Sequence, residues 1–364
     1  MASPVSVAVL DDYPDFSKSF FATLDPASYK VTVFRDTLRP YNHPETTDAE
    51  RDALVKRLEP FEILCIMRER TPFPEALVNR LPNLKLLLST SVRNNSLDLP
   101  AFKARGIPVA GTVEKNRNQT APNPAPDSTT THCVSLILAL VRDIPNSHNA
   151  VQNGLWQVSM ATSLPGKTFA VLGLGRLGLN VARIMSTLFG MRIIAWSENL
   201  TQESADERVK AIGLPVDSPY FSGEKTVTVV SKEDLFREAD VLSVHLVLSD
   251  RSRGIVAAED LGRMKPTAFI VNTSRGPLIK ERDLLDTLKQ GTIAGAAIDV
   301  FDLEPLPKDS EWRTVKWGAD GTSRVVLTPH MGYMAKETMS SWYEQQVENI
   351  KRWAAGEELQ TRLV

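Results

Sequence analysis

The chain has few cysteines and no long apolar run. Its 364 residues include two cysteines, Cys65 and Cys133, each inside an apolar segment, so we expect two buried reduced thiols. No apolar run reaches the length needed to cross a bilayer, and the opening residues lack the basic stretch of a signal peptide. These absences predict a cytoplasmic protein that does not bind membranes.

The chain also lacks a marked excess of positive or negative charge. Lys and Arg total 42 against 44 Asp and Glu, giving a formal net charge of −2. Such a balance creates no strong field for nucleic acid or for an anionic membrane surface. We therefore expect a small-molecule partner, no nucleic acid, and no metal.

Short apolar runs rich in β-branched residues recur along the chain, with helical patterns between them. Near-continuous hydrophobicity is typical of strands buried on both faces, as in parallel sheets covered by helices. The alternation predicts an α/β fold with a doubly wound parallel sheet. The runs occupy residues 5–10, 29–34, 62–67, 84–90, 107–112, 167–175, 191–197, 239–246, 267–274, 293–301 and 323–330.

Three stretches interrupt or end this pattern. Residues 112–131 are rich in Pro, Thr and Asn and predict a linker, followed by a buried helix that starts near Cys133. Residues 219–230 and 307–324 are interpreted as loop-bearing insertions on the surface. The last helical pattern carries one apolar stripe: Met339, Trp342, Tyr343, Val347, Ile350 and Trp353.

A glycine motif follows the run at 167–175 and opens a helical pattern. In "VLGLGRLG", Gly173 allows a tight turn, Gly175 lets a pyrophosphate approach the backbone, and Gly178 lets the helix pack against the strand. Arg176 and Leu177 between them are included among the expected cofactor contacts. The alternative is a strand-to-helix turn that needs glycine for packing alone.

The residue that usually selects between NAD and NADP is not a carboxylate here. Ser197 stands at the end of the next run, where an NAD site commonly presents Asp or Glu to the ribose, and Glu198 follows it. Serine is compatible with either cofactor. Glu198 would repel a 2′-phosphate, and no Arg or Lys follows before Arg208, so we favour NAD while NADP remains possible.

The last three apolar runs each deliver one residue of catalytic type at the carboxyl end: Arg275, Glu304 and His330. In open α/β sheets the ligand crevice lies outside those ends. A guanidinium can bind a carboxylate, and a histidine beside a carboxylate is held in one orientation with its charged form favoured. Each residue taken alone is more often structural or surface-exposed, so the hypothesis depends on their joint placement.

These segments resemble the D-isomer-specific 2-hydroxyacid dehydrogenase family. "VLGLGRLG", "ADVLSVHLVLS", "MKPTAFIVNTSRGPLI", "GAAIDVFDLEPLP" and "LTPHMGY" match its pattern from about residue 165 to 334. The resemblance implies a Rossmann-type cofactor domain over 111–334. It also implies a smaller flavodoxin-like α/β substrate domain over 1–110 and 335–364. A homodimer through the cofactor domains is implied as well.

Roles for individual residues come from the same resemblance. Arg275 would clamp the substrate carboxylate and carbonyl, and His330, polarised by Glu304, would exchange the proton on the carbonyl oxygen. Further expected cofactor contacts are Asp299 near the nicotinamide carboxamide, His245 on a cofactor-lining loop, and Thr273.

The substrate loop departs from the family pattern. The family has a Gly-x-Gly whose backbone N–H groups meet the carboxylate, whereas this chain has Ser91, Val92 and Arg93. Arg93 could add a positive charge to the site or lie on the surface. Arg68 and Arg70 could face the cleft or solvent. Thr131 stands where many members carry glutamate.

The sequence therefore favours an NAD(P)-dependent reductase of a 2-oxo acid to a D-2-hydroxy acid. The alternative is a nucleotide-sensing scaffold of the same fold, like the corepressors related to C-terminal-binding proteins. A formate dehydrogenase is disfavoured because those relatives carry glutamine at the position of Glu304. The substrate itself is left open among glyoxylate, hydroxypyruvate, pyruvate, phosphorylated acids and bulkier 2-oxo acids.

Overall fold

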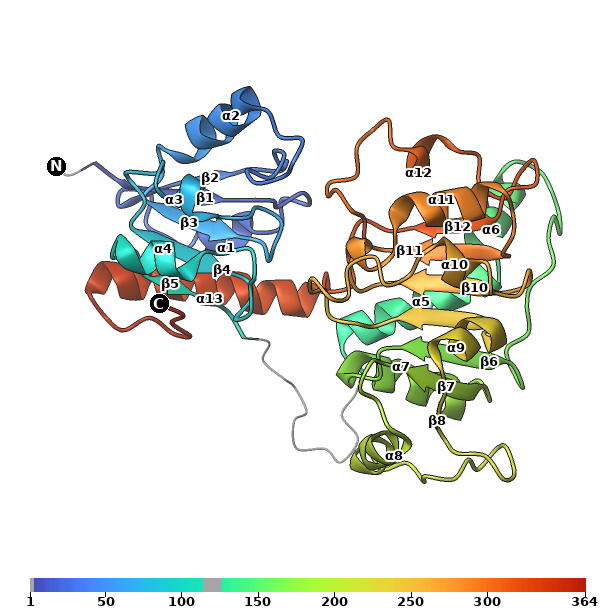
Figure 1. Cartoon of the computed structure of the whole chain (residues 1–364). Coiled ribbons are helices and arrows are strands. Elements are labelled where there is room, and N and C mark those ends of the chain that lie inside the picture. The colour runs from blue at the N-terminus through green and yellow to red at the C-terminus, as the bar shows by residue number, and fades with distance from the viewer. Residues whose placement is uncertain (1–2, 114–125) are drawn as a thin grey trace. The chain divides into compact units, whose positions relative to one another are not determined.

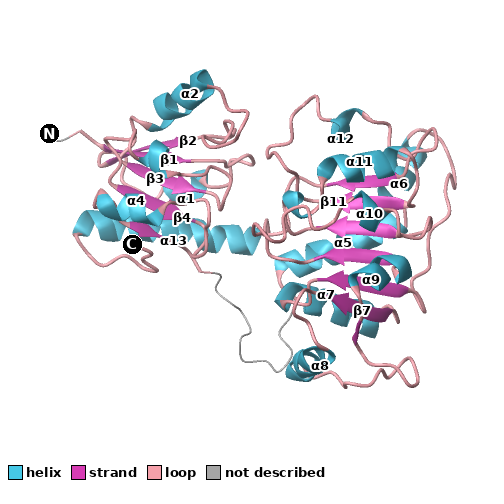
Figure 2. Cartoon of the chain, viewed as in Figure 1, coloured by secondary structure: helices cyan, strands magenta, loops and turns pink. Residues whose placement is uncertain are grey.

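The structure is a computed structural model that describes residues 3–113 and 126–364. Contacts divide the chain into two compact units, Met1–Arg117 with Ala335–Val364, and Asn118–Met334. Each unit is a parallel sheet with helices on its faces (Figures 1 and 2). Among the described residues, no helix is both long enough and apolar enough to span a bilayer.

The first unit contains a five-stranded parallel sheet in the order β2-β1-β3-β4-β5. This is the strand order of flavodoxin-like folds, in which the chain reverses direction across the sheet between β1 and β3. The fold-class prediction is confirmed for this unit. Its strands are β1 (Val5–Val9), β2 (Tyr29–Val33), β3 (Ile63–Ile66), β4 (Leu86–Ser89) and β5 (Val109–Ala110).

Helices cover this sheet on both faces. The short α1 packs with the terminal α13, where the ring of Tyr343 lies 6.1 Å from that of Phe21. The predicted apolar stripe of α13 is buried, except for Trp353, which is half-buried. The helices are α1 (Lys18–Phe21), α2 (Asp48–Leu58), α3 (Glu75–Val78), α4 (Leu99–Ala104) and α13 (Lys336–Ala355).

The second unit contains a seven-stranded parallel sheet in the order β12-β11-β10-β9-β6-β7-β8. The chain reverses direction across this sheet between β6 and β9, which is the switch point of a Rossmann fold. The prediction of a doubly wound parallel sheet is confirmed. Its strands are β6 (Thr168–Leu172), β7 (Arg192–Trp196), β8 (Thr228–Val229), β9 (Val241–Val244), β10 (Phe269–Asn272), β11 (Gly295–Ile298) and β12 (Arg324–Leu327).

Two apolar clusters, one on each face, hold helices against this sheet. One contains residues of α5, α7 and α8, and the other contains residues of α9 to α12. Cys65 and Cys133 are free and buried, as expected. The helices are α5 (Ser128–Val141), α6 (Ile144–Gln152), α7 (Arg176–Thr187), α8 (Gln202–Ala211), α9 (Lys232–Glu238), α10 (Ala258–Leu261), the 3₁₀ helix η1 (Gly276–Leu278), α11 (Glu281–Lys289) and α12 (Glu311–Thr314).

The linker prediction over 112–131 is wrong at its end, because α5 begins at Ser128. Asp127 caps this helix by accepting a hydrogen bond from the backbone N–H of Thr130 at 2.7 Å. The polar residues at 128–131 therefore form a capped first turn and not a loop. Positions 114–125 of the predicted linker lie outside the described residues.

Both predicted surface insertions contain elements that belong to the folded unit. Residues 219–230 include β8, which adds an edge strand beside β7. Residues 307–324 include α12, whose Trp312 is 2% exposed and packs its ring 6.0 Å from that of Phe301. The interpretation of these stretches as surface loops is thus wrong at β8 and at Trp312.

Candidate active site

The glycine turn joins β6 to α7. Gly173 has a φ of +106°, and a Cβ there would lie 2.8 Å from the carbonyl carbon of His245. A Cβ on Gly178 would overlap the carbonyl oxygen of Gly173. Both positions therefore require glycine, the first for its backbone conformation and the third for the close approach of helix and strand.

Gly175 differs from its neighbours because it faces open space. A Cβ there would meet no heavy atom of the described chain within 4 Å, although Gly175 caps the N-terminus of α7. A helix N-terminus with exposed backbone suits a pyrophosphate. Arg176 is exposed and forms an ion pair with Asp127, while Leu177 is half-buried. These features fit a dinucleotide better than a turn that is glycine-rich for packing alone.

The end of β7 carries the residues expected near a ribose. Ser197 is partly buried and Glu198 is exposed. A side chain absent from the expected contacts also reaches the glycine turn: Nη1 of Arg208, on α8, donates to the Leu174 carbonyl at 2.5 Å. Residues 174 and 208 are too far apart in sequence for spacing to reveal this contact, which depends on how α8 packs.

His245 follows β9 and borders the glycine turn. Its Nε2 lies 2.8 Å from Oγ of Ser243, and burial lowers the pKa of His245 to about 4. The imidazole is therefore uncharged at neutral pH. Thr273, at the end of β10, is 8% exposed. Both are placed at the carboxyl edge of the sheet, and His245 is unsuited to donate a proton near neutrality.

Three adjacent strands bring the predicted catalytic residues to one edge of the second unit. The ends of β10, β11 and β12 are in register, with Asn272 opposite Ile298 and Ile298 opposite Leu327. Arg275, Glu304 and His330 lie in the loops that follow these three strands.

The backbone of Arg275 is fixed by neighbouring groups. The side chain of Asn272 donates to the carbonyl of Arg275 at 2.9 Å and accepts from the backbone N–H of Ser274 at 3.0 Å. A Cβ on Gly276 would overlap the backbone of Phe301, so the loop after β10 lies directly on the loop after β11. Glycine at 276 allows this contact.

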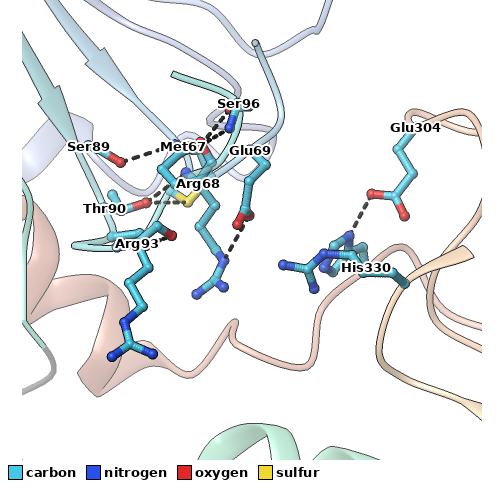
Figure 3. A network of polar contacts seen from close by, with 12 residues as sticks. Met67, Arg68, Glu69, Ser89, Thr90, Arg93, Ser96, Glu304 and His330 are labelled. Carbon is cyan, nitrogen blue, oxygen red and sulfur yellow. Dashed lines mark hydrogen bonds and ion pairs between the residues drawn. The ribbon is translucent and has the colours of Figure 1, made fainter. Parts of the chain in front are cut away.

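Glu304 and His330 form a hydrogen-bonded pair. Nδ1 of His330 lies 2.5 Å from Oε2 of Glu304, and Figure 3 shows the two side chains pointing toward each other. The other carboxylate oxygen accepts from the backbone N–H of Phe301 at 3.0 Å. The side chain of His330 is 18% exposed and that of Glu304 is 20% exposed, so the pair is shielded but reachable.

Asp299 holds the turn that carries His330. Its carbonyl accepts from the backbone N–H of His330 at 2.7 Å. Its carboxylate accepts from the N–H groups of Met331 at 2.9 Å and Gly332 at 3.1 Å, and from Oγ1 of Thr328 at 2.6 Å. Asp299 is 1% exposed, so these hydrogen bonds pair a carboxylate that is buried from solvent. Asp299 was predicted as a cofactor contact only. The structure shows in addition that it anchors the turn that carries His330.

His132 completes this cluster and was missing from the predicted site. Its Nε2 lies 3.2 Å from both Oδ1 of Asp299 and Oγ1 of Thr328. Burial raises the pKa of Asp299, but hydrogen bonds from His132, Thr328 and Met331 outweigh it and hold that pKa below its usual value. The available signal was that one of only five histidines stands directly after the predicted linker, at the start of a buried helix.

The predicted substrate loop lies in the first unit, after β4. The backbone N–H of Arg93 donates to Oγ of Ser91 at 3.1 Å, so this amide is occupied. Within the described ranges, the N–H groups of Ser91 and Val92 meet no acceptor. Two backbone donors are thus available in the place of the family's Gly-x-Gly loop.

The other residues singled out from the sequence belong to separate elements of the two units. Arg68 and Arg70 follow β3 in the first unit, and the guanidinium of Arg70 lies 5.9 Å from the ring centre of Tyr13. Thr131 is exposed on α5 in the second unit, where its Oγ1 donates to the Asp127 carbonyl at 3.0 Å. That contact is a hydrogen bond within the first turn of the helix. The hydroxyl of Thr131 is not ionisable, unlike the glutamate that many family members carry at this position.

A parallel sheet with a glycine turn at its switch point and a Glu-His pair at its carboxyl edge defines an NAD-binding dehydrogenase architecture. Sequence comparison identifies the group. The D-isomer specific 2-hydroxyacid dehydrogenase, NAD binding domain family matches residues 134–332. The chain belongs to this family, which is NAD-binding.

Comparison with individual proteins supports the same family. The chain is 31% identical over 346 residues to glycerate dehydrogenase of Methylorubrum extorquens, covering 90% of this chain and 97% of the relative. It is 31% identical to D-3-phosphoglycerate dehydrogenase of Synechocystis, but spans only 43% of that relative's length. A solved phosphoglycerate oxidoreductase of Vibrio cholerae has a TM-score of 0.76 and 30% identity, covering 97% of this chain and 99% of that chain.

Proposed function

We propose that this chain reduces a 2-oxo acid to the D-2-hydroxy acid with NADH. The observation that carries the proposal is the 2.5 Å pair of Glu304 and His330, at the same sheet edge as the glycine turn. The relatives named above add support, because glycerate and 3-phosphoglycerate are both 2-hydroxy acids. None of them is named as a scaffold, so the corepressor-like alternative is not favoured.

The proposed proton donor is His330. Because its Nδ1 is the atom joined to Glu304, the exchanged proton would be carried on Nε2. Glu304 would hold the ring in one orientation. Arg275 would bind the substrate carboxylate, since the donors of its guanidinium match the two oxygens of that group.

The cofactor would lie along the glycine turn. The open space at Gly175 and the N-terminus of α7 suit the pyrophosphate, with Gly173, Arg176, Leu177 and Gly178 lining the turn. When bound, the nicotinamide supplies the hydride. Ser197 and Glu198 would face the adenosine ribose. His245, Thr273 and Asp299 would border the nicotinamide end, where His245 contributes as an uncharged group.

The direct test is turnover of a panel of 2-oxo acids with NADH and with NADPH. Arg275→Ala and His330→Ala should each lower kcat/KM by about 10²- to 10⁴-fold, the range typical for removing a positioned proton-transfer group or its equivalent. NADH binding, measured by fluorescence titration, should persist in both variants. Matched controls are Arg263→Ala, which follows α10, and His43→Ala in the first unit, which remove the same residue types at positions outside the proposed site residues.

Two results would contradict the proposal. One is near-normal turnover by both Arg275→Ala and His330→Ala on every acid that the parent reduces. The other is cofactor binding by the parent without turnover of any 2-oxo acid, which would favour the scaffold alternative.

A second copy of the chain is the proposed partner of α6. Several apolar side chains there and in the following loop are exposed, including Trp156 at 76% and Met160 at 85%. Large apolar side chains left exposed in one stretch of chain commonly mark an interface. Trp156→Glu should produce a monomer in sedimentation velocity, whereas Leu188→Glu, at the similarly exposed C-cap of α7, should not. Unchanged sedimentation of Trp156→Glu would contradict this assignment. The remaining members of the surface are Ile144, Val151, Leu155 and Val158.

A further inference from the structure

The turn after β12 carries His330 in a backbone conformation that few residues adopt. His330 has a φ of +51°, in the left-handed region that residues other than glycine occupy only when their surroundings hold them there. Its backbone N–H donates to the carbonyl oxygens of Asp299 at 2.7 Å and of Thr328 at 3.1 Å. The direction of the imidazole depends on this backbone, so the contacts that hold the turn also orient the side chain.

The Asp299 carboxylate holds the part of the turn that lies beyond His330. Three of its four hydrogen-bond donors belong to the segment after β12, namely Thr328, Met331 and Gly332. The fourth donor, His132, comes from α5. A buried carboxylate keeps its place only while its oxygens are paired. His132 is therefore the contact through which a helix supports the carboxylate that supports the turn.

The helix α5 also packs directly on this turn. Ser128 and His132 are four residues apart and share one face of the helix. Oγ of Ser128 donates to the Gly332 carbonyl at 2.8 Å. A Cβ on Gly332 would lie 3.5 Å from Cγ2 of Thr129 and 3.7 Å from Cδ2 of His132. The start of α5 thus contacts the backbone two residues beyond His330.

The hydrogen bonds of His132 determine which of its ring nitrogens carries a proton. Nε2 lies 3.2 Å from Oδ1 of Asp299, and an ionised carboxylate only accepts hydrogen bonds. The Thr328 hydroxyl gives its own proton to the same Oδ1 at 2.6 Å, so it offers Nε2 only lone pairs. His132 is therefore a donor from Nε2. Its side chain is 15% exposed, so water has little access to compete for this bond.

We propose that His132 is a positioning residue for His330. It pairs the Asp299 carboxylate, the carboxylate pairs the N–H groups of Met331 and Gly332, and these bonds keep His330 in its left-handed conformation with Nδ1 on Glu304. His132 acts through Asp299 and exchanges no proton with the substrate. This inference rests on the proposed function, in which His330 transfers the proton.

The first test measures steady-state turnover of a 2-oxo acid by variants of His132. His132→Ala should lower kcat about tenfold to a hundredfold, the loss expected when a reacting group is displaced by about 1 Å, while KM and NADH affinity stay within about twofold of the parent. His132→Gln should restore most of kcat, because its amide places an N–H near the position of Nε2. His132→Asn should not, because its amide ends one methylene group closer to the backbone. Val141→Ala, at the buried last residue of α5, is the control for lost helix stability and should leave kcat unchanged.

The second test does not depend on turnover. Labelling histidine with ¹³C at Cε1 gives one NMR resonance for each of the five histidines, and His330→Ala identifies the resonance of His330 by its disappearance. In His132→Ala this resonance should shift and broaden, because the ring is no longer held in one orientation. It should return to its parent position in His132→Gln and stay there in Val141→Ala.

The outcomes separate this inference from the proposed function. If kcat falls no further in His132→Ala than in Val141→Ala, or if the loss lies in KM or in NADH affinity, the positioning role is overturned while turnover by the parent upholds the reaction. If His132→Ala does not fold, equal kcat values in His132→Gln and His132→Asn would overturn it instead. If the parent reduces no 2-oxo acid, the proposed function fails and the NMR resonance decides: an unchanged His330 signal in His132→Ala rejects the positioning role, and a shifted, broadened signal supports it.

Discussion

Replacing Asp299 with asparagine should destabilise the second unit and disable His330 together. The buried carboxylate accepts from four donors: Nε2 of His132, Oγ1 of Thr328, and the N–H groups of Met331 and Gly332. An asparagine has one acceptor oxygen, so in either orientation its NH₂ group faces at least one of these donors. A buried donor left unpaired costs about 1–3 kcal/mol, and loss of charge weakens the remaining bonds. The expected loss in free energy of unfolding at neutral pH is about 2–4 kcal/mol.

The pH dependence of the free energy of unfolding provides a second, independent test of this prediction. Hydrogen bonds hold the pKa of Asp299 in the folded chain below its ordinary value. A lowered folded pKa contributes stability that is complete above the unfolded value of about 3.9 and is lost as pH falls through the folded pKa. The stability gap between the parent and Asp299→Asn should therefore be constant above about pH 5 and shrink below about pH 4.

Urea denaturation at several pH values measures the gap, and steady-state turnover measures the effect on His330. The variant should lose kcat because the turn holding His330 loses its anchor. Asp260→Asn is the matched control: Asp260 is a shielded carboxylate bound to Lys232 at 2.9 Å and to the backbone N–H of Ala257 at 3.0 Å, and neither partner belongs to the turn that carries His330, so its replacement should cost stability without lowering kcat in the folded enzyme. A gap below about 1 kcal/mol at pH 7, or a gap unchanged in acid, would refute the reasoning.

Two alanine substitutions in the glycine turn should separate packing from cofactor binding. Gly178→Ala places a methyl group against the Gly173 carbonyl oxygen and should cost about 1–3 kcal/mol of stability in urea denaturation. Gly175→Ala meets no described atom within 4 Å, so the fold should keep its stability while NADH affinity falls, because the methyl group occupies the space proposed for the pyrophosphate. Unaltered NADH titration of Gly175→Ala, or its unfolding, would count against that placement.

The features that were predictable from sequence share one property: a local pattern determines them. Fully buried strands such as β6 and β10 need apolar residues at every position, so their runs are visible without an alignment. The stripe of α13 is visible for the same reason, at helical spacing. Residues directly after such strands must lie at the carboxyl edge, which places Arg275, Glu304 and His330 there from order alone.

What sequence did not reveal depends on tertiary contacts. The strand β8 has two residues and exists because β7 offers an edge to pair with. The helix α12 has four residues, and Trp312 is buried because Phe301 lies beside it. The contact of Arg208 with Leu174 depends on how α8 packs. The start of α5 is a different case: Asp127 is a readable cap, but the polar composition around it suggested a loop.

The candidate catalytic side chains are oriented by register as much as by their own identity. The backbone N–H of Asp299 donates to the Asn272 carbonyl at 3.0 Å, and that of Thr328 donates to the Ile298 carbonyl at 3.0 Å. These bonds continue the ladder of β10, β11 and β12 one step past the strands. Through them the Asp299 carboxylate reaches the turn after β12, where it holds the backbone beyond His330.

A slip of one residue in β11 would reverse which face Asp299 presents. The carboxylate would then leave the turn, and Glu304 would no longer meet Nδ1 of His330, even though every candidate residue remained in the sequence. Gly295 at the start of β11 opposes such a slip, because a Cβ there would lie 2.6 Å from the Arg324 carbonyl oxygen. The arrangement of the candidate catalytic side chains therefore depends partly on Gly295, which contacts none of them.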